Sequence, residues 1–342
     1  MSLALKPRPS LEGQNFHVVV VGGGINGVAI ARECARAGKR TLLLEQNDFA
    51  SGVTSRSTRI IHGGLRYLEH GELGLVRESV RERERLLAER SHLVQPLHFL
   101  FLLNENSQRS ALKVRFGLWL YQRLSGKKSS PVSEMDLARV HRALDTGQRW
   151  QILNYEDAQC EFPERLVAEW MTEAEDAGAV VRNHCEVIAV NISQGRARGV
   201  LLRDRTTGKD YRVDAGWVIN CTGPWVDRIC QRSTVRTGKP LLGGIRGSHI
   251  ILPRFAGAPN SALYTEAADG RRGREVRPRP DRGPVEARPA PHRRGAAEGR
   301  VGRAAGPGLP VPDRRRAGGG PAAENGRLAD GVERLRADRG RL

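Results

Sequence analysis

Short unbroken apolar runs alternate with amphipathic stretches along the first part of the chain. Residues 17–21 read HVVVV and residues 41–45 read TLLLE, and such runs are typical of parallel strands buried on both faces. Between them, VAIARECARAG places small apolar residues at helical spacing and stops at Gly38, which predicts a helix. The order strand, helix, strand indicates an α/β fold built on a parallel sheet.

Helical and extended patterns continue to alternate through the middle of the chain, although the strands there include antiparallel ones. WVINCTGPWVD predicts one more buried strand, which ends in a Gly-Pro turn. The other expected elements are helices at 74–90 and 113–128, a strand at 98–103, a helix, glycine stop and strand over 165–190, antiparallel strands around TTGK over 196–219, and a strand entered through GIRGSHIILP at 244–253.

Three glycines stand between the first predicted strand and the first predicted helix. In the spacing Gly22-x-Gly24-x-x-Gly27, the first permits a tight turn, the second lets a pyrophosphate approach the backbone, and the third lets helix and strand pack closely. Glu45 follows the second strand, 18 positions after Gly27, where a carboxylate can accept hydrogen bonds from a ribose. This pattern predicts a dinucleotide site. The alternative is a glycine-rich turn without a ligand.

A polar, glycine-rich segment follows the second strand. Residues 55–72 read SRSTRIIHGGLRYLEHGE, which is too polar for a core strand and too rich in glycine for an ordinary helix. Its hydroxyls and backbone amides can run past a pyrophosphate and along a flavin ring. The segment therefore favours FAD over NAD, between which the glycine pattern alone does not choose.

Four segments together resemble the FAD-dependent glycerol-3-phosphate dehydrogenases, within the D-amino-acid-oxidase-like flavoproteins. They are GGGINGVAIA, LLEQNDFASGVTSRSTRIIHGGLRYLEH, VINCTGPWVD and IRGSHIILP. The block ending HGGLRYLEH is specific to that family, and the resemblance runs from about residue 16 to about 270. It implies a Rossmann-like FAD-binding domain (GR2/DAO-type), an incomplete antiparallel-sheet substrate domain, and oxidation of sn-glycerol 3-phosphate to dihydroxyacetone phosphate.

The resemblance implies roles for particular residues. Arg66 and Tyr67 would orient the substrate, although Arg66 could instead pair with Glu69. His249 would be the catalytic base or a hydrogen-bond partner, although a histidine beside an Ile-Ile-Leu run could equally be a core residue. The implied FAD contacts are Gly22, Gly24, Ile25, Asn26, Gly27, Glu45, Gln46, Ser55, Ser57, Thr58, His62, Gly63, Gly64, Val187 beside the adenine, and Thr222 and Gly223, although CTGPW could also be an ordinary strand-end turn.

Charge is concentrated at the C-terminal end. The chain carries a net charge of +18, and residues 271–342 hold 19 arginines against 9 acidic residues. That segment contains no aromatic residue, whereas Arg/Gly tails that bind RNA usually interleave aromatic side chains. We therefore expect no nucleic-acid partner, and treat a basic RNA-binding tail as the weaker alternative.

The composition also divides the chain. Residues 1–15 are expected to be flexible. Residues 16–270 form the oxidoreductase domain, with FAD-binding parts at about 16–75 and 165–230 and substrate-domain parts at about 76–164 and 231–270. Residues 271–342 consist mostly of Arg, Gly, Pro and Ala, and are expected to be disordered. The abrupt change fits a reading-frame shift, with a natural flexible tail as the alternative. It also predicts impaired activity, because the substrate cations and closing FAD segment of the family are missing.

Five scattered cysteines without a CxxC pair indicate a reducing compartment and no metal site.

KVRFGLWLYQRLSGKK at 113–128 mixes aromatic and basic residues, which suits either an amphipathic core helix or a membrane-surface helix. The resemblance adds glycerol 3-phosphate as substrate and a quinone, or oxygen, as electron acceptor. The expected location is cytoplasmic, with peripheral attachment to the cytoplasmic face of the inner membrane.

Overall fold

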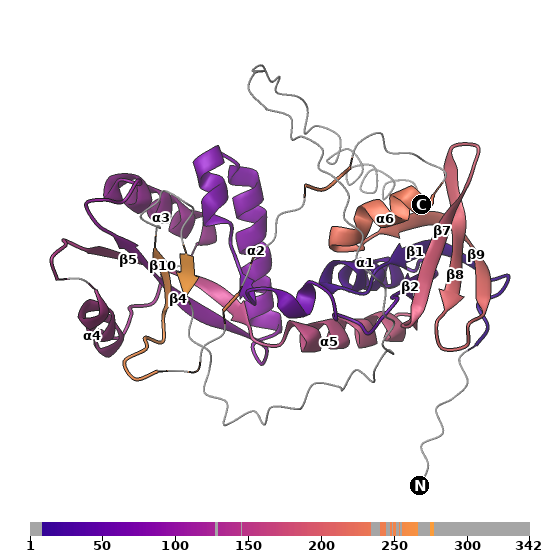
Figure 1. Cartoon of the computed structure of the whole chain (residues 1–342), viewed down its shortest axis with the longest axis horizontal. Helices are drawn as coiled ribbons and strands as arrows, with labels where there is room; N and C mark the ends of the chain where they lie inside the picture. The colour runs from indigo at the N-terminus through magenta and orange to yellow at the C-terminus, as the bar shows by residue number, and fades with distance from the viewer. Residues whose placement is uncertain are drawn as a thin grey trace, which may run out of the picture. The chain divides into compact units, whose positions relative to one another are not determined.

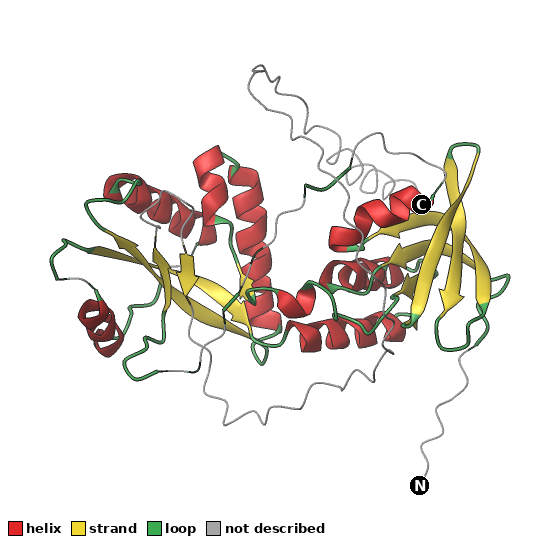
Figure 2. Cartoon of the chain, in the orientation of Figure 1, coloured by secondary structure: helices red, strands yellow, loops and turns green. Residues whose placement is uncertain are grey.

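The computed structural model describes residues 9–126, 129–144, 146–233, 240–243, 247, 249–250, 253, 255–265 and 274–276. The chain divides into two compact units, Met1–Gly283 and Pro284–Leu342, and the second lies outside the described residues. The described strands of the first unit form two sheets, each packed with helices (Figure 1, Figure 2). The α/β class expected from the strand and helix order is confirmed.

The first sheet has six strands in the order β6-β2-β1-β9-β8-β7. The first four of these run parallel, and β7, β8 and β9 form an antiparallel meander around the predicted TTGK turn. The strands are β1 (Asn15–Val21), β2 (Thr41–Leu44), β6 (Val180–Arg182), β7 (Cys185–Ser193), β8 (Arg196–Asp204) and β9 (Asp210–Asn220).

The valine run of β1 is buried because this sheet is covered on both faces. Alternate side chains of a strand point to opposite faces. Val18 and Val20 share a core cluster with α1 (Ile25–Arg36) and α5 (Pro163–Asp176). Val19 and Val21 lie in a second cluster, with residues of the β7–β9 meander. The continuous apolar run is therefore a consequence of two covered faces, as expected for a central parallel strand.

The second sheet has five strands in the order β11-β10-β4-β5-β3. The substrate sheet was expected to be antiparallel, but β10 pairs parallel with β4, so the sheet is mixed. The strands are β3 (Ile60–Ile61), β4 (Val94–Leu103), β5 (Gln151–Cys160), β10 (Ala262–Thr265) and β11 (Arg274–Val276).

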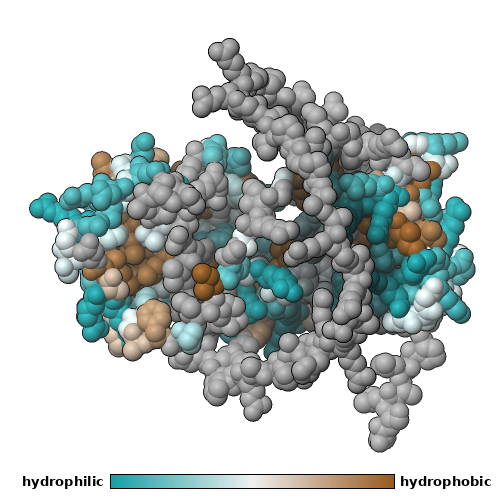
Figure 3. Space-filling view, in the orientation of Figure 1, coloured by the Kyte–Doolittle hydropathy of each residue, from teal (hydrophilic) through white to brown (hydrophobic). Residues whose placement is uncertain are grey.

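Strand β4 buries both of its faces against helices. Phe99 and Phe101 lie in a cluster with α2 (Leu73–Glu89) and α3 (Ala111–Ser125), and Phe99 stacks on Tyr155 of β5 at 4.9 Å between ring centroids. Leu100 and Leu102 point the other way, toward α4 (Glu134–Ala143). Figure 3 shows apolar residues gathered over the β5 and β10 side of this sheet. The predicted helices and the 98–103 strand are thus present, with slightly shifted ends.

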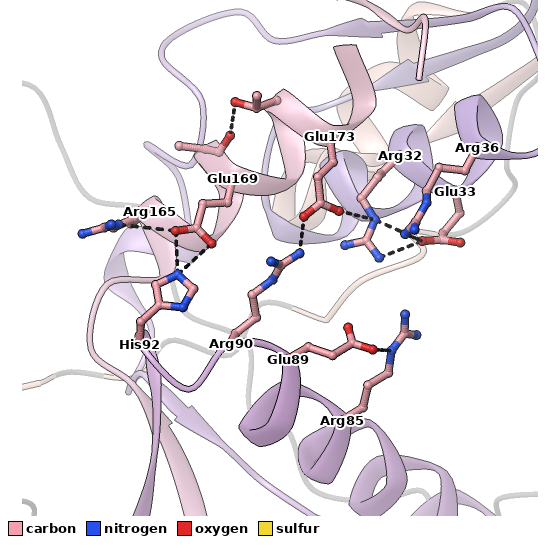
Figure 4. A network of polar contacts seen from close by, with 12 residues as sticks. Arg32, Glu33, Arg36, Arg85, Glu89, Arg90, His92, Arg165, Glu169 and Glu173 are labelled. Atoms are coloured by element: carbon pink, nitrogen blue, oxygen red, sulfur yellow. Dashed lines mark hydrogen bonds and ion pairs between the residues drawn. The ribbon is translucent and has the colours of Figure 1, made fainter. Parts of the chain in front are cut away.

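A polar network crosses from the end of α2 to α1 and α5 (Figure 4). Glu173 of α5 pairs with Arg90, which follows α2, and lies 3.5 Å from the Nε of Arg32 on α1. His92 lies 2.9 Å from Glu169, one turn earlier on α5. The network joins elements of the two sheets, because β4 begins directly after His92 while α1 and α5 cover the first sheet.

Three expectations need correction. The N-terminal 15 residues were expected to be flexible; residues 1–8 lie outside the described residues, but Leu11 is buried in the cluster beneath β1, because it covers the apolar base of the sheet. Residues 274–276 of the expected disordered tail form β11, because their backbone extends the edge of β10. Of the strand expected at 244–253, the described residues His249, Ile250 and Pro253 lie in no strand, and Ile250 is 85% exposed, whereas 244–246, 248 and 251–252 lie outside the described residues. The rest of the tail lies outside the described residues.

Candidate functional site

The carboxyl ends of three parallel strands meet at one edge of the first sheet. Val21, the last residue of β1, pairs with Leu44 of β2 on one side and Asn220 of β9 on the other. The loops that follow these strands therefore start level with one another. Ligands of open α/β sheets bind at this edge, where loops from neighbouring strands separate.

The glycine turn after β1 leaves no space for larger residues. Gly22 has φ of +108°, and a Cβ there would lie 2.5 Å from the carbonyl oxygen of Cys221. A Cβ on Gly27 would lie 1.8 Å from the carbonyl oxygen of Gly22. Gly24 is less confined, since its Cβ would lie 3.2 Å from Thr54 Oγ1. The first and third glycines of the predicted pattern are therefore required by packing within the chain itself.

The N-terminus of α1 opens directly from this turn. The N–H of Ile25 donates to Thr54 Oγ1 at 3.1 Å, so a hydroxyl from the loop after β2 holds the helix start. The next N–H groups, of the exposed Asn26 and of Gly27, belong to a first helical turn and have no intrahelical acceptor. A helix start with such donors and a positive dipole end suits a phosphate.

Glu45 connects the glycine turn to the end of β2. Its Oε2 accepts the N–H of Gly23 at 2.7 Å, and its Oε1 accepts the N–H of Asn47 at 2.8 Å. The carboxylate is thus fixed in orientation, and each oxygen keeps a further lone pair for a ribose hydroxyl. Beside it, the carbonyl of Gln46 accepts from Arg205 Nη1 at 3.1 Å, which holds the backbone after β2 in place.

The hydroxyl-rich loop is held by its own backbone. Ser55 Oγ donates to the carbonyl of Gly52 at 3.0 Å, and Ser57 Oγ donates to the carbonyl of Thr54 at 3.2 Å, around the short 3₁₀ helix η1 (Thr54–Arg56). Thr58 is partly buried. The same loop touches the β9 end, because a Cβ on Gly52 would lie 3.3 Å from the Trp225 ring.

The turn after β9 is organised by Asn220. Its Oδ1 accepts from the N–H and the hydroxyl of Thr222, at 3.2 and 2.7 Å. Gly223 follows with φ of +57° and starts the 3₁₀ helix η3 (Gly223–Trp225), ahead of α6 (Val226–Arg232). Burial, with a smaller contribution from Cys34, raises the pKa of the Cys221 thiol to about 11, so this side chain behind the glycine turn is neutral.

The segment from His62 to Tyr67 lies over the second sheet. The N–H of Gly63 donates to Asp157 Oδ1 at 3.1 Å, and Nδ1 of the exposed His62 lies 3.9 Å from the other oxygen of that carboxylate. Gly64 has φ of +82° and begins the 3₁₀ helix η2 (Leu65–His70), with the 44% exposed Tyr67 ring close against it. Arg66 lies in η2, and its side chain lies outside the described residues.

Residues 17–316 match the family of FAD dependent oxidoreductases called DAO. The chain belongs to this family. The match continues past about residue 270, where the four sequence segments used above stop. FAD is thus the cofactor of the family, and the glycine turn, α1 start and Glu45 fit the pyrophosphate and ribose of such a dinucleotide.

Two relatives of this FAD-dependent oxidoreductase have named substrates. A glycerol-3-phosphate dehydrogenase of Synechocystis sp. is 41% identical over 273 residues, covering 76% of this chain and 49% of that protein. A D-erythritol 1-phosphate dehydrogenase of Brucella abortus is 35% identical over 254 residues, covering 74% and 50%. The chain therefore spans about half the length of these relatives.

The fold has a match among solved structures. The L-proline dehydrogenase from P. horikoshii superposes with a TM-score of 0.52 at 19% identity, covering 80% of this chain and 74% of that one. At this identity the likeness concerns the fold alone. It agrees with the Rossmann-like FAD-binding architecture expected from the sequence.

Two of the expected site residues of this FAD-dependent oxidoreductase stand apart from the converging loops. His249 is exposed, and no contact joins it to Tyr67 or His62 within the described ranges. The side chain of Val187 is 3% exposed and packs in the second core cluster, so only its backbone could meet an adenine. Neither His249 as a base nor Val187 as an adenine neighbour is tested by this geometry.

No sequence pattern predicted three residues whose side chains hold the backbone of the candidate site in place. Thr54 caps α1, Asn220 orders the turn after β9, and Asp157 holds Gly63. Thr54 lies one residue before the hydroxyls that were singled out, and Asn220 directly precedes CTGPW, so adjacency could have indicated both. Asp157 gives no such local signal, because it lies 94 positions from its partner.

Proposed function

We propose that this chain is an FAD-dependent enzyme, or the part of one, that oxidises sn-glycerol 3-phosphate to dihydroxyacetone phosphate. The observation that carries the proposal is the 41% identity to a glycerol-3-phosphate dehydrogenase over 273 residues, which cover 76% of this chain. The two named relatives both act on the phosphate ester of a small polyol, which supports a secondary alcohol near a phosphate as the substrate class.

The residues divide the work between cofactor and substrate. FAD, when bound, supplies the acceptor for the hydride that leaves the alcohol carbon. The glycine turn and the start of α1 hold the pyrophosphate, and Glu45 holds the ribose. Arg66 and Tyr67 orient the phosphate ester, since a guanidinium pairs well with a dianion, and His249 takes the hydroxyl proton, since a neutral imidazole nitrogen can accept one.

A dye-linked assay tests the proposed reaction. The purified chain with FAD is expected to reduce dichlorophenolindophenol when glycerol 3-phosphate is added, with a kcat/KM at least about tenfold above that for D-erythritol 1-phosphate, since one misplaced group costs about 1–3 kcal/mol. A higher kcat/KM for D-erythritol 1-phosphate would show that the longer polyol phosphate is the preferred substrate. Flavin that stays bound to the frame-restored chain but is reduced by neither compound would refute both.

Residues 271–342 are expected to lower the turnover rate of the chain. We propose that they are out of frame, because Arg, Gly, Pro and Ala replace apolar strand patterns there, although the family match extends to residue 316. Translation of the other two frames after codon 270 should then show strand patterns and a closing FAD segment, and the restored chain should turn over faster than the present one. Equal turnover by both chains would contradict this.

A surface of α3 supports contact with a membrane. Leu112, Phe116 and Trp119 are 77, 63 and 52% exposed and lie on one side of the helix, while Val114 and Leu118 on the other side are buried in the core. Exposed cations flank the apolar side: Lys113, Arg115 and Arg123. The helix can therefore pack into the core with one side and contact a membrane surface with the other. None of the described helices is long and apolar enough to cross a membrane.

We expect the double substitution F116S/W119S to weaken binding to anionic vesicles. Removing two aromatic side chains that would insert among headgroups should lower the partition coefficient about tenfold or more in vesicle sedimentation. Trp217→Ser is the matched control, because Trp217 is 70% exposed on β9 and far from α3 in sequence. If the control loses as much binding as the double variant, α3 is not the contact. A membrane contact of this kind would bring the enzyme to a quinone acceptor.

A further inference from the structure

A charged cluster is buried beneath the segment that carries His62 and Gly63. Asp157 of β5, Arg83 of α2 and Tyr121 of α3 are 3, 4 and 2% exposed. Burying charges is costly unless each is paired and hydrogen-bonded. Such a cluster in the middle of the sheet-to-helix interface therefore needs a reason beyond stability.

The cluster is internally paired. Arg83 Nη1 donates to Asp157 Oδ1 at 2.6 Å and to the Tyr121 hydroxyl oxygen at 2.8 Å, and its Nη2 lies 2.7 Å from Glu84 Oε1. The Tyr121 hydroxyl donates to Asp157 Oδ1. Burial alone would lower the pKa of Arg83, but Tyr121, Asp157 and Glu84 together raise it, so the guanidinium stays charged. Burial, then Asp157, raises the pKa of Tyr121, so its hydroxyl stays protonated.

The third donor to Asp157 Oδ1 is the backbone N–H of Gly63, at 3.1 Å. The backbone lies so close to the cluster that a Cβ on Gly63 would be 1.8 Å from the Tyr121 hydroxyl oxygen and 2.8 Å from Val80. The second carboxylate oxygen lies 3.9 Å from His62 Nδ1, whose side chain is 52% exposed. The buried carboxylate thus holds the loop through the backbone of Gly63, and the imidazole of His62 lies near it without a hydrogen bond.

We propose that Asp157 is a positioning residue of the flavin site, which fixes the backbone at Gly63, the residue after His62, while Arg83 and Tyr121 hold its carboxylate in place. The glycines at 63 and 64 let the segment lie flat on this carboxylate. The position of the segment above the second sheet is then fixed, and so is the position of the side that faces away from Asp157. The loop that carries Ser55 and Ser57 has no such buried support. The hydroxyls of these two residues bond only to the backbone of their own turn.

The test compares Asp157→Asn with Glu156→Gln in the purified chain, with and without added FAD. Glu156 is a matched control, because it is the preceding residue of β5 and its Oε2 also lies 3.9 Å from a histidine nitrogen, His98 Nδ1. The substitution Glu156→Gln leaves the backbone carbonyl of residue 156, which contacts Arg83, unchanged. Hydrogen exchange of the Gly63 amide should accelerate about tenfold in Asp157→Asn, because the oxygen that accepts its N–H loses its charge, and less than about twofold in Glu156→Gln. The absorption bands of bound flavin should shift only in Asp157→Asn.

Equal exchange and equal flavin spectra in the two variants would overturn the proposal. Should Asp157→Asn not fold, Tyr121→Phe decides instead, because it keeps the charge pair and removes one support of the carboxylate. It should accelerate exchange of the Gly63 amide by about threefold to tenfold, and unchanged exchange would equally overturn the proposal. The inference rests on the FAD site proposed above, but the exchange measurement needs no flavin, so a failure of that site and a failure of this anchor are distinguishable.

Discussion

Replacing Gly27 by alanine is expected to remove bound FAD. The added Cβ would lie 1.8 Å from the carbonyl oxygen of Gly22, so the start of α1 must move away from β1. Such overpacking costs about 3 kcal/mol, which lowers affinity about a hundredfold if it falls on the FAD-binding conformation. Flavin absorbance that remains with the protein after desalting, followed by a fluorescence titration, measures the loss.

Gly74→Ala is the matched control for that substitution. Gly74 is exposed in α2, and a Cβ there would meet no atom within 4 Å. Alanine in a helix interior is favoured over glycine by about 0.5–1 kcal/mol, so this variant should keep its flavin and unfold at slightly higher urea. Flavin retained by Gly27→Ala to the same extent as by Gly74→Ala would show that the glycine turn does not hold the cofactor.

Replacing Asp136 by alanine is expected to detach the segment that leads into β10. Asp136 is 3% exposed on α4 and accepts the N–H of Asn260 at 2.6 Å, the N–H of Ser261 at 2.8 Å and the Ser261 hydroxyl. Each buried donor left without an acceptor costs about 1–3 kcal/mol, so the free energy of unfolding should fall by about 2–4 kcal/mol. Urea denaturation measures the change, and faster hydrogen exchange in β10 would localise it.

Glu134→Ala separates this anchoring from the general effect of an acidic residue at a helix start. Glu134 is exposed in the same first turn of α4, and its carboxylate is removed equally. The loss of a charge near the positive end of a helix costs only about 0.3–1 kcal/mol. If both variants lose the same stability, the contacts of Asp136 with Asn260 and Ser261 contribute nothing measurable.

Much of the first sheet could be predicted because its signals are local. The valine run of β1, the glycine turn and the acid after β2 follow one another within a single stretch of chain, and each depends on backbone geometry that its own residues determine. The second sheet was harder. Its strand β3 has only Ile60 and Ile61 and forms by pairing with β5, almost a hundred positions later, so no pattern within the segment could indicate it.

The sequence by itself determined the parallel strands and first helix of the first sheet, the glycine turn with Glu45 beside it, and the family to which the chain belongs. Tertiary structure alone decided that β10 lies parallel to β4, that Thr54 caps α1, and that a buried carboxylate, Asp157, supports Gly63. The physical reason is that periodicity and turn chemistry act between near neighbours, whereas burial of a charge depends on packing. Arg83, Tyr121 and Asp157 meet only after α2, α3 and β5 have packed together.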